Sequence, residues 1–294
     1  MSDGYQLPLS HYIAKKPKAT IIALHGFNDY RNAFTPLCHY LSNNNINCYA
    51  YDQRGFGETK HRGLWPKKGV LQNDLVTMTQ LIKEKHPKLP LYVIGESMGG
   101  AVIMTAFADK QVTHVEGIGL LAPAVWARHT QPWYQQLALW VTVRIAPGWQ
   151  PTGKGFEKIV SDNNEMLKEL SKDPLVIKGT RIDTIYGLTN LMDQALESAK
   201  TLSEKGVIFY GKKDELITKK PTCEMLGNIT SNENNLRNNW RFVLYEEGYH
   251  MLSRDLQAET VYQDLITWIN NTAQSLSKEL SLSNDQWRNQ YCDA

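Results

Sequence analysis

The fold is decided at Leu91-Tyr92-Val93-Ile94-Gly95-Glu96-Ser97-Met98-Gly99-Gly100-Ala101, where a buried-strand run leads through Gly-x-Ser-x-Gly into a helical pattern. A serine at a sharp strand-to-helix turn has strained backbone geometry, and side chains at Gly95 and Gly99 would clash there. Such a turn lifts the Ser97 hydroxyl above the sheet edge and points the first N–H groups of the helix at the same place. Because a bare Gly-x-Ser-x-Gly also occurs by chance, the flanking strand and helix are what make Ser97 the predicted nucleophile.

Short apolar runs alternate with helical patterns on both sides of this stretch, as in a mainly parallel sheet covered by helices. The runs are continuous rather than alternating, which is expected for strands buried on both faces. They comprise residues 20–24, 46–51, 91–94, 118–121, 207–210 and 242–245. Apolar residues recur at helical spacing over 71–82 and 261–269. The sequence therefore predicts an α/β fold with a mostly parallel central sheet flanked by helices.

The alternation is interrupted between residues 124 and 200, where no good buried strand occurs. This stretch begins aromatic and apolar, and then becomes polar and charged with helical spacing. We predict that 124–200 is an inserted helical lid and that 1–123 and 201–294 form the core domain. The segment from about residue 273 to the end is polar and is expected to be loosely held.

The overall composition excludes several classes of protein. Hydrophobic residues make up 42% and charged residues 21% of the 294 residues, which is typical of a globular chain. The formal net charge is +2 and no basic block stands out, so a nucleic-acid partner is not expected. No run approaches the roughly 18 apolar residues that would span a bilayer. The start of the chain lacks a basic stretch followed by an apolar one, so a secretory signal is not expected either.

The cysteines are Cys38, Cys48, Cys223 and Cys292, and no Cys-x-x-Cys occurs among them. This spacing argues against metal fingers and dithiol redox sites. A disulfide framework is not expected in a chain of this size. We predict free, mostly packed thiols in a reducing compartment, and therefore a cytoplasmic location.

A base and an acid follow the last two strand runs of the core. A serine hydroxyl is a poor nucleophile without a base, and the order expected on this architecture is Ser, then Asp or Glu, then His. Asp214 and His250 lie just past the carboxyl ends of these runs, where ligands bind in parallel sheets. His250 would take the proton of Ser97, and Asp214 would orient the imidazole and stabilise its cation. Glu215, beside Asp214, remains an alternative acid.

Other carboxylates fit the acid position less well, because they lie in the insertion, follow the histidine or precede the serine. They are Asp183, Asp193, Asp255 and Asp52. An acyl-transfer site also needs donors aimed at the charge that develops on the substrate oxygen. The N–H of Met98 is one candidate, and the N–H of Phe27, in the loop after an early strand, is the second. His25 precedes that loop, and we interpret it as a structural residue.

Five motifs occur in the order seen in α/β-hydrolases: His25-Gly26, Asp52-Gln53-Arg54-Gly55-Phe56-Gly57, Gly95-Glu96-Ser97-Met98-Gly99-Gly100, Gly211-Lys212-Lys213-Asp214 and His250. The chain resembles the monoglyceride lipase and lysophospholipase branch, which includes serine aminopeptidase-like members. The resemblance spans about residues 20–252. It implies an eight-stranded sheet, a helical lid and hydrolysis of acyl esters. It also implies a Ser97–His250–Asp214 triad and an oxyanion hole formed by Phe27 and Met98.

Two departures from this branch concern the substrate rather than the chemistry. Glu96 stands where lipases usually have His, and the loop after His25-Gly26 reads Phe-Asn-Asp-Tyr. Residues 133–146 form an apolar helical pattern that starts after Pro132 and stops at Pro147-Gly148. We interpret this helix either as a lid packed on the domain or as a wall for the acyl chain with aromatic surface that touches lipid. The side chains predicted to form that wall are Trp133, Leu137 and Trp140.

The sequence thus predicts a serine hydrolase that cleaves carboxylic esters with an apolar acyl chain and needs neither a metal nor an organic cofactor. Monoacylglycerols or lysophospholipids are the expected substrates, and a transient contact with a lipid surface is the expected interaction. Hydrolysis of peptides or amides is an alternative, for which Glu96 or a carboxylate of the lid would have to capture an amine. A non-catalytic ligand receptor on the same scaffold is a second alternative, although such proteins often lose a member of the triad.

Overall fold

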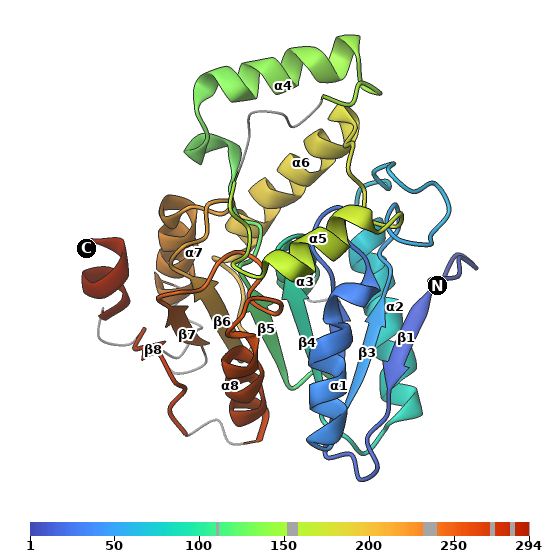
Figure 1. Ribbon diagram of the computed structural model, residues 1–294, viewed down its shortest axis with the longest axis vertical. Coiled ribbons are helices and arrows are strands. Elements are labelled where there is room, and N and C mark those ends of the chain that lie inside the picture. Colours follow the sequence, from blue (N-terminus) through green and yellow to red (C-terminus); the bar gives the residue numbers. More distant parts are fainter. Residues whose placement is uncertain (110–111, 152–157, 232–239, 271–273, 283–285, 294) are drawn as a thin grey trace.

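The structure is a computed structural model that describes residues 1–109, 112–151, 158–231, 240–270, 274–282 and 286–293 (Figure 1). Within these residues one sheet has the strand order β1-β3-β2-β4-β5-β6-β7-β8. The strands are β1 (Leu9–Tyr12), β2 (Ala19–Leu24), β3 (Ile46–Tyr51), β4 (Leu91–Glu96), β5 (Gly117–Leu121), β6 (Gly206–Gly211), β7 (Trp240–Tyr245) and β8 (Glu279–Leu280). The strands β2 to β7 pair in parallel, whereas β1 and β8 are antiparallel edge strands.

The predicted α/β architecture is confirmed, and each of the six continuous apolar runs forms a parallel strand. The sequence patterns did not predict the edge strands β1 and β8, for two physical reasons. In β1 exposed and half-buried residues alternate, so the strand carries no apolar run. The strand β8 has only two residues, which is too short for a period to be recognised.

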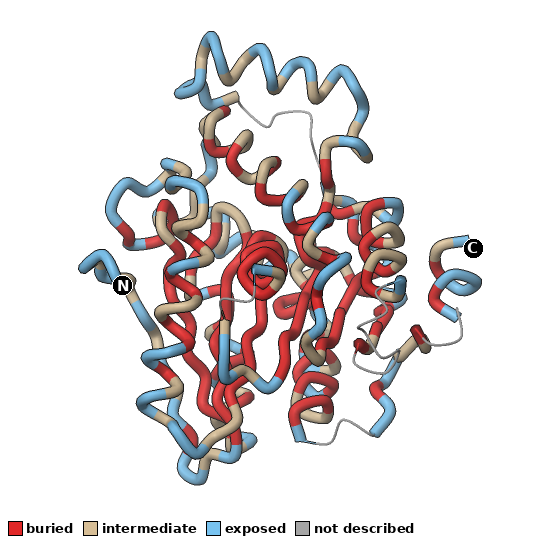
Figure 2. Tube along the Cα trace, turned by 180° about the vertical axis from the view of Figure 1, so that it is seen from behind, coloured by how far each residue is buried: buried red, intermediate tan, exposed pale blue. Residues whose placement is uncertain are grey.

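Helices cover both faces of the sheet (Figure 1). They are α1 (Thr35–Asn43), α2 (Val70–Lys85), α3 (Met98–Ala108), α4 (Trp133–Ile145), α5 (Asn164–Lys172), α6 (Ile182–Ser198), α7 (Lys219–Ser231) and α8 (Ala258–Asn270), with short helical turns at Arg31–Phe34, Arg128–Thr130 and Arg288–Cys292. Successive strand residues face opposite layers. Ile22 and Val93 belong to the core shared with α2, α3, α6 and α7, whereas Ile21 and Ile94 belong to the core shared with α1 and α8. The buried centre in Figure 2 is therefore two cores separated by the sheet.

The described parts of residues 124–200, called here the interrupting segment, lie above the carboxyl ends of the strands (Figure 1). The helix α6 packs against α3, and α4 lies farthest from the sheet and contacts α6. The predicted helix after Pro132 is confirmed as α4 (Trp133–Ile145), and none of its residues is buried. Residues 152–157 of the predicted 124–200 lid lie outside the described residues. The division into a core and a lid remains a prediction.

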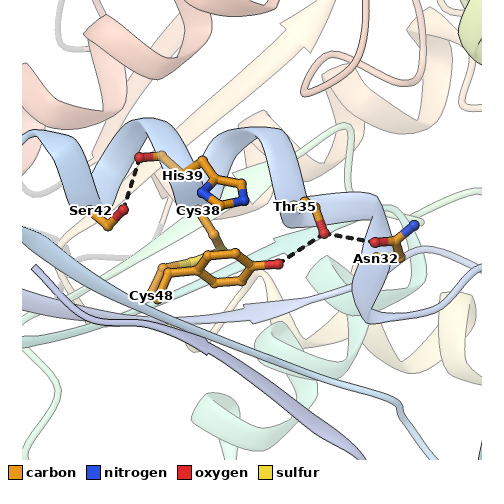
Figure 3. The surroundings of a disulfide bond; sticks show 7 residues. Asn32, Thr35, Cys38, His39, Ser42 and Cys48 are labelled. Atoms are coloured by element: carbon orange, nitrogen blue, oxygen red, sulfur yellow. Dashed lines mark hydrogen bonds between the residues drawn. A yellow bond between two sulfur atoms is a disulfide. The ribbon is translucent and has the colours of Figure 1, made fainter.

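The expectation of free thiols is wrong, because the structure pairs the cysteines as Cys38–Cys48 and Cys223–Cys292. Cys38 on α1 faces Cys48 on β3 with a Cα–Cα distance of 5.2 Å, within the range that a disulfide bridges (Figure 3). This proximity arises because α1 packs on β3, and sequence spacing alone does not show it. The free-thiol argument for a reducing, cytoplasmic compartment therefore loses its basis.

The expectation of a loosely held C-terminal segment is also wrong for its described parts, 274–282 and 286–293. The Cys223–Cys292 disulfide ties this segment to α7, and β8 pairs with β7. Trp287 and Tyr291 are buried. A few large aromatic side chains and one crosslink thus anchor a segment whose composition is mostly polar. Residues 273, 283–285 and 294 lie outside the described residues.

Candidate active site

The predicted strand–turn–helix around Ser97 is confirmed. Ser97 lies between β4 and α3 with φ 53° and ψ −114°, a backbone conformation that L-residues rarely adopt. A Cβ at Gly99 would lie 2.1 Å from the carbonyl oxygen of Leu24, and one at Gly95 would lie 2.4 Å from the backbone of Gly99. The two glycines are therefore required by close packing around the turn. Backbone strain of this kind persists where the surrounding structure imposes it, as it does at active sites.

The histidine and the aspartate predicted to serve Ser97 are hydrogen-bonded to each other. His250 Nδ1 lies 2.7 Å from Asp214 Oδ2, and both side chains are buried. The other oxygen of Asp214 accepts the N–H groups of Leu216 and Ile217 at 2.7 and 3.0 Å. The structure thus places Asp214 at the imidazole, whereas the alternative acid Glu215 accepts the N–H of Ile159.

The electrostatic environment favours the protonated form of His250. Burial alone lowers the pKa of the imidazole, but the Asp214 carboxylate and its hydrogen bond, with a smaller contribution from Glu96, outweigh burial. The pKa of His250 is consequently raised above its usual value of 6.5. Because an ionised carboxylate only accepts hydrogen bonds, Asp214 orders the ring with the proton on Nδ1. The lone pair on Nε2 is then the one that can accept a proton.

Ser97 and His250 line one cavity of about 480 Å³. Its outer wall comes from the interrupting segment. The residues contributed by α4 and α6 are Gln135, Leu139, Ile185, Leu188, Thr189 and Met192. Trp126, Leu216, Ile217 and Met251 add further apolar surface. The cavity therefore combines the predicted nucleophile and the predicted base with a largely apolar wall, as ligand sites commonly combine polar groups with apolar surface.

Both predicted oxyanion donors lie beside Ser97. Met98 is the first residue of α3, so its N–H belongs to the helix terminus that lacks intrahelical partners. The loop that carries Phe27 approaches from the other side, because a Cβ at Gly26 would lie 3.4 Å from the Cβ of Ser97. The side chain of Phe27 also lines the cavity. The positions of Phe27 and Met98 suit an oxyanion hole, and their role remains a prediction.

The loop that carries Phe27 is held by buried polar contacts. His25 Nδ1 lies 2.8 Å from the carbonyl oxygen of Gly26, and His25 Nε2 accepts the N–H of Gln53 at 2.9 Å. Burial lowers the pKa of His25. The histidine is therefore neutral and fully engaged, which agrees with a structural role. On the far side of the loop, Asn28 donates to the Thr180 hydroxyl at 2.7 Å and so ties the loop to the interrupting segment.

The residues predicted as an acyl-chain wall lie on the opposite side of α4 from the cavity. Trp133, Leu137 and Trp140 are 73%, 52% and 53% exposed and do not line it. Gln135 and Leu139, half a helical turn away, do. The wrapped apolar pattern of α4 did not indicate which side faces inward. Substrate contact by the three predicted residues remains a prediction.

Sequence reasoning missed a buried charge cluster next to Ser97. Arg254 Nη1 lies 2.8 Å from Asp29 Oδ2, and Arg254 Nη2 donates to Glu96 at 3.0 Å. The second oxygen of Glu96 accepts the Ser253 hydroxyl at 2.6 Å. Asp29, Glu96 and Arg254 all line the cavity. A buried Arg four residues after the histidine had no signal in the local sequence pattern.

The parallel sheet, the strained serine turn at its edge, and a histidine that lines the same cavity as the serine and is hydrogen-bonded to an aspartate make the chain an α/β-hydrolase. The family model described as serine aminopeptidase, S33 matches residues 15–257. The chain belongs to this family.

Curated relatives and solved structures agree with this assignment. Monoglyceride lipase from Rattus norvegicus is 24% identical over 260 residues, which cover 87% of this chain and 83% of the relative. The solved soluble variant of monoglyceride lipase from Saccharomyces cerevisiae has a TM-score of 0.75 at 19% identity, covering 93% of this chain and 94% of that one. A carboxyl esterase from Bacillus coagulans has a TM-score of 0.76 at 17% identity, covering 91% and 94%. The chain is thus similar to lipases and esterases and falls in the carboxylic-ester hydrolase class.

Proposed function

We propose that the protein hydrolyses carboxylic esters with an apolar acyl chain, with monoacylglycerols as the lead substrate and lysophospholipids as the next. The observation that carries this proposal is the cavity that Ser97 and His250 both line, beneath side chains of α4 and α6, with Asp214 hydrogen-bonded to His250. An apolar wall of this size suits an acyl chain, and the resemblance to proteins named monoglyceride lipase supports the glyceride.

The proposed mechanism has two steps. In the first, Ser97 attacks the ester carbonyl while Nε2 of His250 takes the hydroxyl proton. The N–H groups of Met98 and Phe27 stabilise the tetrahedral oxyanion, and one such donor is worth about 2.7–4 kcal/mol of barrier. His250 then gives its proton to the leaving alcohol, and Asp214 stabilises the imidazolium throughout. In the second step, a water activated by His250 hydrolyses the acyl-enzyme and releases the acid.

The test is release of fatty acid from monoacylglycerols and lysophospholipids of graded chain length. We expect activity that rises with chain length until the cavity is filled, and none in Ser97→Ala. A flat and feeble response across both series would contradict the proposal. A fluorophosphonate probe should label the native protein and Ser171→Ala, an exposed-serine control on α5, but not Ser97→Ala. Absence of labelling in the native protein would favour the receptor alternative.

Amide hydrolysis is the weaker alternative. It requires a carboxylate that can capture the substrate amine, and the sequence offered Glu96. Both oxygens of Glu96 are already engaged, by Ser253 and Arg254. A panel of p-nitrophenyl esters against aminoacyl amides separates the two reactions, and a preference for the amides would overturn the ester proposal.

We also propose that α4 contacts lipid aggregates transiently. Its outer side exposes Trp133, Leu137 and Trp140, and Arg144 is its one charged residue. Amphipathic aromatic side chains suit a lipid interface, whereas the low charge argues against strong attraction to anionic lipids. Within the described residues, every helix is too short or too polar to cross a bilayer. Co-sedimentation with zwitterionic vesicles should weaken in Trp133→Ser/Trp140→Ser, and equal binding by the variant would refute the contact.

A further inference from the structure

Residues 158–163 belong to the 124–200 segment. They contact both the loop that carries Asp214 and the loop that carries His250. On the aspartate side, the Lys158 ammonium donates to the carbonyl oxygen of Glu215, and the N–H of Ile159 donates to the Glu215 carboxylate at 3.1 Å. Glu215 directly follows Asp214 in the chain. The segment therefore holds the aspartate loop one residue away from the carboxylate that orients the imidazole.

The same segment holds the histidine loop through different residues. The N–H of Met251, next to His250, donates to the carbonyl oxygen of Val160 at 3.0 Å. The Ser161 hydroxyl donates to Asp255 at 2.6 Å, and both side chains are buried. The other oxygen of Asp255 accepts the N–H of Tyr249 at 2.8 Å. The residues on both sides of His250 are thus fixed to 158–163, one directly and one through Asp255.

The two loops are also hydrogen-bonded directly to each other. The N–H of Lys213, next to Asp214, donates to the carbonyl oxygen of Gly248, two residues before His250, at 2.9 Å. A Cβ at Gly211 would lie 2.4 Å from that same oxygen. The histidine loop is therefore held both by residues 158–163 and by the aspartate loop. Loss of its contacts with 158–163 would let it move relative to the serine turn.

We propose that Ser161 and Asp255 are positioning residues for the hydrolytic reaction, acting through Tyr249 to hold His250 between Asp214 and Ser97. This inference rests on the proposed function. Neither residue lines the cavity around Ser97, so neither is expected to touch the substrate. A displacement of about 1 Å in a reacting group can cost about 100-fold in rate. Loss of the Ser161–Asp255 contact should accordingly lower kcat by roughly 10- to 100-fold and leave KM within about twofold.

The experiment measures kcat and KM on a monoacylglycerol in Ser161→Ala and Asp255→Asn, with Ser161→Thr as the variant that retains the hydroxyl. Ser171→Ala is the matched control, because its exposed hydroxyl bonds only the carbonyl of Lys168 within α5. We expect the two disruptive variants to lose kcat, Ser161→Thr to recover most of it and the control to match the native protein. The low-pH limb of kcat/KM should move toward the ordinary histidine value in Ser161→Ala, because the His250–Asp214 hydrogen bond loosens.

Melting temperatures separate positioning from a merely structural role. If Ser161→Ala melts earlier but keeps native kcat and pH profile, the inference is refuted, as it is by a rise in KM alone. Asp255→Asn removes a buried carboxylate and could fail to fold, and in that case Ser161→Ala decides. Failure of the proposed function would look different, because the native protein itself would neither release fatty acid nor react with the fluorophosphonate.

Discussion

Arg254→Met removes the cation from the buried cluster of Asp29, Glu96 and Arg254 beside Ser97. The Arg254 side chain is 7% exposed and bridges Asp29, also 7% exposed, and Glu96, 3% exposed. Burial by itself lowers the pKa of Arg254, but the two carboxylates outweigh it and raise that pKa. The guanidinium is therefore charged at every working pH. In the variant, Glu96 keeps its hydrogen bond from Ser253, but both buried carboxylates lose their counter-charge.

Removing one partner of a buried ion pair typically costs about 3–5 kcal/mol, because the remaining charge stays desolvated. One cation here serves two carboxylates, while Ser253 still satisfies part of Glu96. We therefore expect the free energy of unfolding to fall by about 4 kcal/mol at pH 7. For a chain of this size the melting temperature would drop by roughly 6–7 °C.

Urea unfolding followed by tryptophan fluorescence at pH 7 measures this loss of stability. Arg144→Met on the exposed side of α4 is the matched control and should change stability by less than about 0.5 kcal/mol. A loss below about 1 kcal/mol in Arg254→Met would refute the idea of a stabilising buried cation.

Three further outcomes follow from the site. The value of kcat/KM should rise with pH with a midpoint above 6.5, because the raised pKa of His250 keeps the base protonated to higher pH; a lower midpoint in the pH–rate profile would contradict this. Asp214→Asn should lower kcat about 10⁴-fold with the melting temperature largely retained, and a loss below tenfold would reassign the acid. Gly99→Ala should cost about 3 kcal/mol of stability or more in thermal unfolding, because its Cβ would lie 2.1 Å from the Leu24 carbonyl oxygen; a fully stable variant would contradict the packing at Ser97.

Local sequence patterns predict much of the fold and of the candidate site. The continuous apolar runs and the glycine-flanked Ser97 predict the parallel sheet and the turn at its edge. The position of Asp214 and His250 just past late strands predicts that they meet, since the carboxyl ends of parallel strands lie along one edge. These features can be predicted from sequence because they depend on backbone conformation and on burial, which residues close together in the chain determine.

Other features depend on which surfaces the folded chain brings together. The Cys38–Cys48 pair exists because α1 packs on β3, and the C-terminal segment is held by aromatic burial and a crosslink to α7. Nothing in the local pattern of α4 distinguished the side that carries Leu139 from the exposed side that carries Trp133.

By itself, the sequence determined an α/β chain with a strained serine turn and a histidine–aspartate pair at the same sheet edge. Only the tertiary structure showed which side of α4 lines the cavity and that Arg254 pairs with Asp29 and Glu96. It also showed that residues 158–163 hold the loops that carry Asp214 and His250. The physical reason is one of range. Strand and turn propensities act between neighbours in the chain, whereas these contacts join residues 56 or more positions apart, which only the packed fold brings within hydrogen-bonding distance.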